Sequence, residues 1–323
     1  MSQKKKKSKV FKIIKIVILT VLFIALIAGV AFGGFFLFKT LSGGINTALS
    51  GCNGCNPAEE DQFEMGMFPQ TIKADDVTIS ATPDADGYYT GSDGEKYAKV
   101  VASPYAGGYS FSDDTAVVNG EEYFFKLEPI VWTVIRAEDD GTALVVSNLA
   151  LDAHAFCDCN NTADDCNDYK NSAVREWLND EFLDYFTSEE MAKIITEEVD
   201  NTKGSTADWN NKGLDNPYVC DNTNDKVFLL SYVEAFESHN RYDFDLQDRG
   251  RNASDYAVAK GVELGDLNST AYWLRSPEKT NDESVSAVGN YTVGGNGLQT
   301  ALPSTQNVHK ILGVVPAMWI NMD

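Results

Sequence analysis

Cysteine offers the widest chemistry in this chain, because a thiolate can attack a substrate, bind zinc or join a disulfide. The 323-residue sequence contains six: Cys52, Cys55, Cys157, Cys159, Cys166 and Cys220. An even number favours disulfides in an exported protein. Catalysis by a cysteine is not indicated, because the three histidines are scattered and no family signature surrounds any cysteine.

The spacing of the cysteines limits how they can pair. Cys52 and Cys55 form a C-x-x-C motif, typical of redox dithiols and of half zinc sites, but no thioredoxin-like pattern and no second C-x-x-C follows. A bridge between Cys157 and Cys159 would be strained, because one residue separates them. We therefore expect one of these two to pair with Cys166 and the other with Cys220.

Acidic loops raise the question of calcium, which takes six or more oxygen ligands. The main candidate is "DNTND", which offers Asp221, Asn224 and Asp225. Two other stretches also supply acids: one has Asp84 and Asp86, and the other has Asp164, Asp165 and Asp168. None completes an EF-hand loop, because the bidentate glutamate at position 12 is absent. Calcium is the one cofactor that the sequence leaves open, and a solvated acidic loop is the alternative.

The stretch "TAYWLRSPEK" places Arg275 inside an aromatic, apolar run. A buried arginine needs a carboxylate partner, because an unpaired buried charge is very costly. We favour a structural ion pair for Arg275, and recognition of a ligand is the alternative. Four tryptophans are likewise assigned to the core rather than to a carbohydrate platform: Trp132, Trp177, Trp273 and Trp319.

Strand patterns surround these residues. Residues 124–151 are typical of two strands joined by a turn at residues 139–141. Residues 225–231 indicate a short buried strand, and residues 310–322 indicate a final apolar strand.

Helix signals alternate with the strand runs. Residues 171–186 place apolar side chains along one helical face. Capping boxes predict helices that begin at Thr187 and at Ser231, and Gly261 predicts the end of another short helix. Helices set between strand runs predict an α+β domain.

Six motifs occur in an order that resembles an uncharacterised bacterial domain family of unknown function, common in Firmicutes: "GMFPQT", "EPIVWTVI", "VREWLNDEF", "KVFLLS", "YWLRSP" and "GVVPAMWIN". The resemblance covers about residues 63–323. That family usually ends with WWLRSPG and GVRPALWL, and Val315 stands here in place of its arginine. The ending also resembles C-type-lectin-like folds, including formylglycine-generating-enzyme-like domains, which implies antiparallel strands with two or more flanking helices.

The N-terminal region predicts a membrane anchor. Residues 16–38 contain no charge and are long enough for a helix to cross a bilayer. The basic tail at residues 1–15 should be cytoplasmic, because lysines accumulate on that side. Residues 39–62 predict a flexible stalk, and residues 63–323 an extracellular domain on a single-pass cell-membrane protein.

Two features of this region suggest further associations with the membrane. Ala25, Gly29 and Gly33 form a stripe of small residues through which two such helices can dimerise. The stretch "LSGC" resembles a bacterial lipoprotein box that would lipidate Cys52. Lipidation is disfavoured, because 13 residues separate Phe38 from Cys52.

Charge narrows the functional classes. The net charge is −22, and the chain after residue 39 carries 18 Lys+Arg against 48 Asp+Glu. Such an acidic body repels phosphate backbones, so nucleic acid is not expected as a partner. We expect a membrane-anchored, non-enzymatic module that recognises an extracellular protein or glycan. A structural or envelope-organising protein without a small ligand is the alternative. A formylglycine-generating-like enzyme is less favoured, because the last cysteine, Cys220, is followed by 103 residues.

Overall fold

The computed structural model describes residues 62–158, 166–206, 216–236, 249–279, 282–293 and 299–322. Strands account for 43% of these residues and helices for 18%. The prediction of an α+β, C-type-lectin-like domain was therefore wrong: the described part of the chain is mainly β. The physical reason is that apolar side chains repeat along helical faces for only one or two turns before the backbone becomes extended again.

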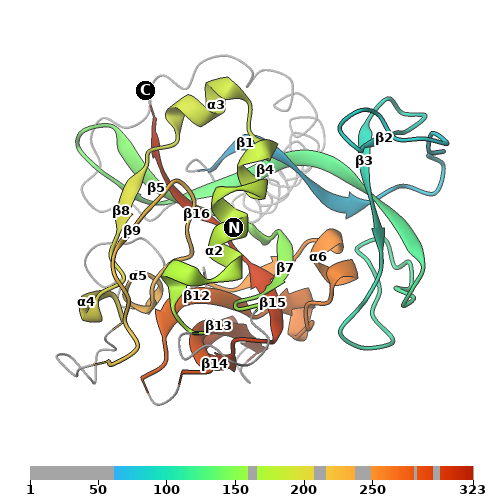
Figure 1. The fold of residues 1–323 in the computed structure, drawn as a ribbon. Helices are drawn as coiled ribbons and strands as arrows, with labels where there is room; N and C mark the ends of the chain where they lie inside the picture. Colours follow the sequence, from blue (N-terminus) through green and yellow to red (C-terminus); the bar gives the residue numbers. More distant parts are fainter. Residues whose placement is uncertain are drawn as a thin grey trace, which may run out of the picture. The chain divides into compact units, whose positions relative to one another are not determined.

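A six-stranded antiparallel sheet is organised around one long strand, β4 (Glu122–Ala137) (Figure 1). One edge of β4 pairs with β1 (Gln62–Ile72). The other edge pairs with β3 (Lys96–Val101) near its start and with β5 (Thr142–Ser147) near its end. The predicted turn between β4 and β5 is confirmed, with Gly141 at φ 87°. The sheet is completed by β2 (Tyr89–Thr90) beside β3 and β16 (Ala317–Asn321) beside β5.

A second sheet has five strands in the order β14-β13-β12-β15-β7. Its members are β14 (Gln299–Asn307), β13 (Ser284–Val293), β12 (Tyr272–Pro277), β15 (Ile311–Val314) and β7 (Asp152–Ala155). The single strand predicted over residues 310–322 is thus two strands, β15 and β16, in two different sheets. The break falls at Val315 and Pro316, and proline removes the amide that a continuous ladder would use.

Two smaller sheets are formed by strands that fall among those of the larger sheets in the sequence. The first joins β6 (Leu149–Ala150), β10 (Arg251–Ala253) and β11 (Ser269–Thr270), with β6 and β10 parallel. The second pairs β8 (Glu197–Val199) with β9 (Thr223–Asp225). Because β5, β6 and β7 follow one another directly, residues 142–155 supply strands to three sheets and tie them together.

The α-helices of the described residues are short: α2 (Ala173–Asn179), α3 (Ser188–Lys193), α4 (Lys203–Thr206), α5 (Tyr232–Phe236) and α6 (Asp255–Lys260). The helix expected over residues 171–186 is interrupted at Asp180, whose backbone is non-helical, and continues as the 3-10 helix η4 (Glu181–Tyr185). A second 3-10 helix, η3 (Tyr169–Asn171), precedes α2. The apolar face that the sequence indicated is nevertheless buried: Val174, Trp177, Leu178, Phe182 and Phe186.

Capping determines where the helices begin and end. The box predicted at Thr187 and Glu190 is present at α3. The box at α5 is present as well, with Ser231 N–H and Glu234 N–H each donating to the other residue's side chain. Helix α6 ends at Gly261 with φ 110°, and a β-carbon there would lie 2.9 Å from the Ser103 carbonyl oxygen. These local predictions are confirmed because caps depend on residues within one turn.

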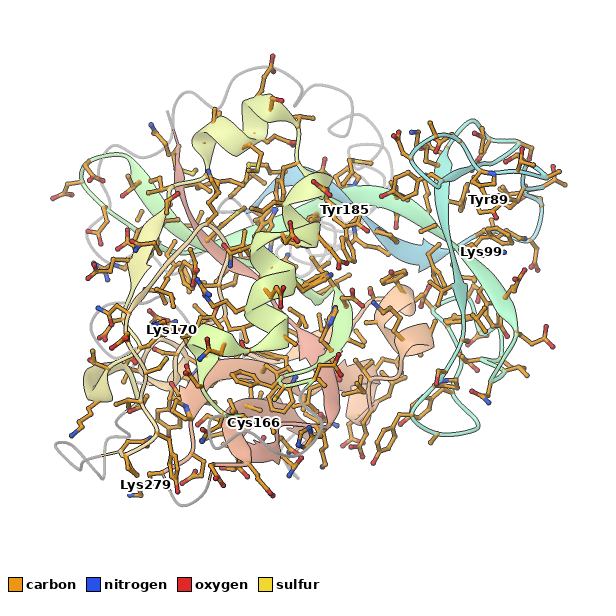
Figure 2. The ribbon with its side chains drawn as sticks, in the orientation of Figure 1. Tyr89, Lys99, Cys166, Lys170, Tyr185 and Lys279 are labelled. Carbon is orange, nitrogen blue, oxygen red and sulfur yellow. The ribbon has the colours of Figure 1, made fainter. Side chains whose placement is uncertain are left out.

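Aromatic packing joins β1 to the helices. Phe68 of β1 is 1% exposed, and its ring lies 4.6 Å from Tyr185 and 5.5 Å from Tyr256, between centroids. Tyr185 is labelled in Figure 2 near the end of the α2–η4 segment. Gly66 allows β1 to pack closely against Phe186, because a β-carbon at residue 66 would lie only 2.7 Å from the Phe186 ring. The φ of +75° at this position also favours glycine.

The described residues contain no helix that is long and apolar enough to cross a membrane. The structure therefore does not support the predicted transmembrane helix or the single-pass assignment that depends on it. Residues 16–38, on which that prediction rests, lie outside the described residues. So do Cys52, Cys55, the small-residue stripe of Ala25, Gly29 and Gly33, and all of the predicted stalk except Gln62, which begins β1.

Candidate functional site

Arg275 lies on β12, is 2% exposed and has a complete set of internal partners. Both of its terminal nitrogens donate to the carboxylate of Glu234 on α5, and one of these hydrogen bonds is 2.9 Å long. The Leu229 and Asp200 carbonyl oxygens accept further bonds from the guanidinium at 2.7 Å and 3.2 Å. The geometry corresponds to the structural ion pair rather than to ligand recognition, because no face of this guanidinium is exposed.

The tryptophans singled out by the sequence are also mainly structural. Trp132 and Trp273 are 0% exposed, and each indole N–H donates to a carbonyl, of Met65 and of His154 respectively. Trp177 is buried, whereas Trp319 is partly exposed and lies under the guanidinium of Arg136. Val315, which replaces the arginine of the resembling family, is buried in the same core.

The structure brings together one of the cysteine pairs left open. The sulfur atoms of Cys157 and Cys166 are both buried and lie 2.9 Å apart (Cys166 is labelled in Figure 2). Cys220 carries a free thiol, and Cys159 lies outside the described residues. Burial, followed by a hydrogen bond to Asp168, raises the pKa of Cys220 to about 12. That thiol is therefore protonated at neutral pH and is a poor nucleophile.

The calcium candidates Asp221, Asn224 and Asp225 are not gathered around a common point. Asp225 is 1% exposed and accepts hydrogen bonds from the Arg175 guanidinium. Asp221 pairs instead with Lys170, at 2.9 Å. Within the part of the chain that the structure describes, no group of three or more His, Cys, Asp or Glu side chains could hold a metal ion. Asp164 and Asp165 lie outside that part, while Asp84 forms an ion pair with Lys96.

A buried carboxylate that the sequence did not indicate lies at Asp152 on β7. It is 2% exposed, accepts from Lys260 Nζ at 2.7 Å, and contacts His154 Nε2 at 3.1 Å. Burial raises the pKa of Asp152, but the hydrogen bond with His154 and the charge of Lys260 outweigh it and hold the pKa below its ordinary value. The cluster joins β7 to α6 and is satisfied internally, which indicates a structural role.

A pocket of about 230 Å³ opens where β1, β10 and the start of α6 meet. Gln70 and Thr71 from the end of β1 form one wall, and Ser110 and Ser112 from a loop after β3 form another. The remaining lining comes from residues 149 and 252–268, including Asp255 and Asn268. Segments separated by almost 200 residues in the sequence thus share one concave surface.

Asp255 is fixed in the pocket by the backbone around it. Its carboxylate accepts from Ile72 N–H at 3.0 Å, from Ser112 N–H at 2.8 Å and from the Ser112 hydroxyl at 2.7 Å. The side chain is only 7% exposed. Three hydrogen bonds hold both oxygens in place, so Asp255 is a rigid member of the pocket lining.

The pocket rim contains a strained backbone segment. Leu267 and Asn268 have φ values of 58° and 59° within the 3-10 helix η5 (Asp266–Asn268). Asparagine tolerates this left-handed conformation, whereas leucine rarely adopts it. Leu267 is also 57% exposed. Strain of this kind persists only where surrounding structure imposes it, and it often accompanies binding sites.

Sequence reasoning did not find this pocket. Its polar residues are ordinary surface types, spread from residue 70 to residue 268, and none belongs to a motif with a chemical meaning. A local signal that could have located part of it is Ser254, which caps α6 in the structure and is followed by Asp255.

Residues 140–322 match a domain of unknown function, DUF6273. The match covers more than half of the chain, so this protein belongs to that family. Neither the curated proteins nor the solved structures contain a match. The family region begins at the β4–β5 turn, so one side of the pocket, with Gln70, Thr71, Ser110 and Ser112, comes from outside it.

Proposed function

We propose that residues 62–322 are a non-enzymatic recognition module that binds a small polar ligand in the Asp255 pocket. The observation that carries this proposal is a buried, rigidly held carboxylate surrounded by polar side chains in a concave site. Binding sites commonly combine a preformed cavity with a few fixed polar groups.

The proposal includes an extracellular location and an extracellular protein or glycan as the source of the ligand. The buried pair Cys157 and Cys166 is suited to an oxidising compartment. The net charge of −22 disfavours nucleic acid as a partner.

We also infer that β1 to β4 belong to the same functional unit as the family region. Two of the six motifs, "GMFPQT" and "EPIVWTVI", lie before residue 140. Strand β4 pairs with β5, which lies within the family region, and β1 supplies part of the pocket lining. The six-motif resemblance over about residues 63–323 therefore describes the unit better than residues 140–322 alone.

The test is a thermal-shift screen of the purified full-length protein against neutral sugars, amino acids, polyamines, nucleosides and sugar phosphates. A ligand at 100 times its Kd adds about 2.7 kcal/mol to stability, which is measurable as a rise in Tm. Ser110→Trp places a large side chain in the pocket. Asn224→Trp adds the same side chain to an exposed strand position that does not line it.

We expect at least one compound to raise the Tm of the parent and of Asn224→Trp, but not that of Ser110→Trp. If no compound raises the Tm, or if the rise persists in Ser110→Trp, the pocket is not a binding site. The structural or envelope-organising alternative would then be preferred.

A further inference from the structure

The charges around the pocket restrict the class of ligand. Among the described residues that line it, Asp255 is the one with a charged side chain, and the others are hydroxyl, amide or aliphatic. A phosphate or carboxylate group would lie near a buried negative charge without any cation to offset it. An amino acid would meet the same difficulty at its carboxylate. The pocket is therefore unsuited to anionic and zwitterionic ligands.

Asp255 has little hydrogen-bonding capacity left for a ligand. A carboxylate has about four acceptor positions, and three of them are used by Ile72 and Ser112. About one position is left for a ligand. An ammonium group has three donors and calcium takes six or more oxygens, whereas one hydroxyl group brings a single donor. The remaining capacity of Asp255 therefore matches a hydroxyl.

Gln70 provides a second fixed group. Its side-chain nitrogen donates to the carbonyl oxygens of Glu128 and Pro129, both at 3.0 Å. Two acceptor partners determine which end of the amide is the nitrogen, so Oε1 is the end left without a protein partner among the described residues. Gln70 is also one of the residues that line the pocket, so its amide is a fixed polar group there.

Three further side chains are available to a ligand. Ser110, Asn252 and Asn268 line the pocket, and no side-chain hydrogen bond within the described part of the chain uses them. Hydroxyl and amide groups both donate and accept. The hydroxyl groups of a ligand also donate and accept hydrogen bonds, so each donor of the pocket can meet an acceptor of the ligand and each acceptor a donor. Leu149, Val258 and Leu264 add apolar surface for the carbon skeleton.

We propose that the pocket binds a neutral polyhydroxyl ligand, namely a single uncharged sugar residue, free or at the end of a glycan. One ligand hydroxyl donates to Asp255, another donates to Gln70 Oε1, and Asn252 and Asn268 bond with the hydroxyls nearer the rim. This assignment depends on the proposed recognition function and adds the ligand class to it. The volume of about 230 Å³ lies below the range of about 300–1,000 Å³ for drug-sized ligands and is in keeping with one ring.

The left-handed backbone at the rim positions a side chain for ligand binding. It sets the position from which the Asn268 amide lines the pocket, and it leaves Leu267 exposed beside it. Asn268→Gly removes the amide but keeps a residue that adopts positive φ without strain. Loss of binding in this variant would therefore report the side chain and not a collapsed loop.

The experiment measures binding by saturation-transfer NMR and calorimetry with the full-length protein. The neutral probes are glucose, galactose, mannose and N-acetylglucosamine, together with their common disaccharides. The charged probes are glucosamine, glucuronate, glucose 6-phosphate and spermidine. We expect at least one neutral sugar to bind at least ten times more tightly than every charged probe.

The variants locate the site. Asn252→Ala and Asn268→Gly should each weaken binding of that sugar by about three- to tenfold, the effect of losing one or two hydrogen bonds. Asn224→Ala is the matched control, because Asn224 is also exposed on a strand but does not line the pocket. It should leave the affinity unchanged, and all three variants should keep a cooperative melting transition.

The outcomes separate the two proposals. If a charged probe binds best and Ser110→Trp abolishes that binding, the sugar assignment is wrong while the recognition function stands. If a sugar binds with equal affinity to the parent and to the pocket variants, both proposals fail, because its site is elsewhere. Both also fail if no probe binds.

Discussion

Arg275 and Glu234 form an ion pair that is almost completely shielded from water. The side chain of Arg275 is 2% exposed and that of Glu234 is 16% exposed. The pair joins β12 to α5, and it fixes the Asp200 and Leu229 carbonyls as well. Its place in an aromatic, apolar run left recognition of a ligand as the alternative to a structural role, but the surrounding protein uses its hydrogen bonds.

We expect Arg275→Met to destabilise the protein strongly. Removing one partner of a buried pair leaves the other charge uncompensated, at a cost of about 3–5 kcal/mol. For a domain of this size that corresponds to a fall in Tm of roughly 10 °C. The double variant Arg275→Met/Glu234→Met should lose less, because no charge is left unpaired. Equal Tm values for parent and Arg275→Met in calorimetry would contradict the structural role.

The lowered pKa of Asp152 should make the stability of the folded protein depend on pH. Its pKa in the folded protein is below the ordinary value of 3.8, so it stabilises the folded state above that value. The contribution is lost as the pH falls below 3.8 through the lowered pKa. The Tm difference between the parent and Asp152→Asn should therefore be largest near neutral pH and shrink toward pH 3. A difference that is independent of pH would show that the charge of Asp152 does not stabilise the fold.

At the scale of elements, the sequence predicted the ends of helices but not the pairing of distant strands. The boxes that begin α3 and α5 and the glycine that ends α6 follow from residues one turn apart. The division of residues 310–322 between two sheets does not, because β15 pairs with β7 and β16 with β5, each more than 150 residues away. A strand carries no local information about which strand will be its neighbour.

The connection between β7 and η3 predicts a specific disulfide. We expect Cys157 and Cys166 to be joined in protein recovered from an oxidising compartment, because their side chains are buried in contact with each other. Alkylation without reduction, followed by mass spectrometry, should yield a linked peptide. Cys220 should react slowly with the alkylating agent, because its pKa is raised to about 12. Full alkylation of both Cys157 and Cys166 would contradict this pairing.

For the whole molecule, the family region and the folding unit have different boundaries. The match begins at residue 140, inside the turn that joins β4 to β5. Strand β4 brings Ile130 and Trp132, both 0% exposed, into the same core as Val145 and Val146 of β5. Without β1 to β4, one edge of β5 would be unpaired and this core would be open.

We therefore expect a fragment of residues 138–323 to lack a cooperative fold, whereas a fragment of residues 62–323 should melt cooperatively. Circular dichroism and proton NMR dispersion distinguish the two results. A well-dispersed spectrum and a sharp thermal transition for the shorter fragment would show that the family region folds independently of β1 to β4.

The sequence by itself determined the features that depend on near neighbours: the β4–β5 turn, the caps of α3 and α5, the end of α6 and the buried face around Trp177. It also indicated that the chain belongs to an uncharacterised family, and the match over residues 140–322 supports this. Only the tertiary structure decided that the described chain is mainly β, that Arg275 is paired with Glu234, and that Asp255 lies in a pocket with Gln70. Each of these depends on contacts between distant residues, and one sequence does not reveal which distant segments meet. The pocket was beyond prediction for a further reason: its serines, asparagines and glutamine are common on any surface, and only their convergence gives them a function.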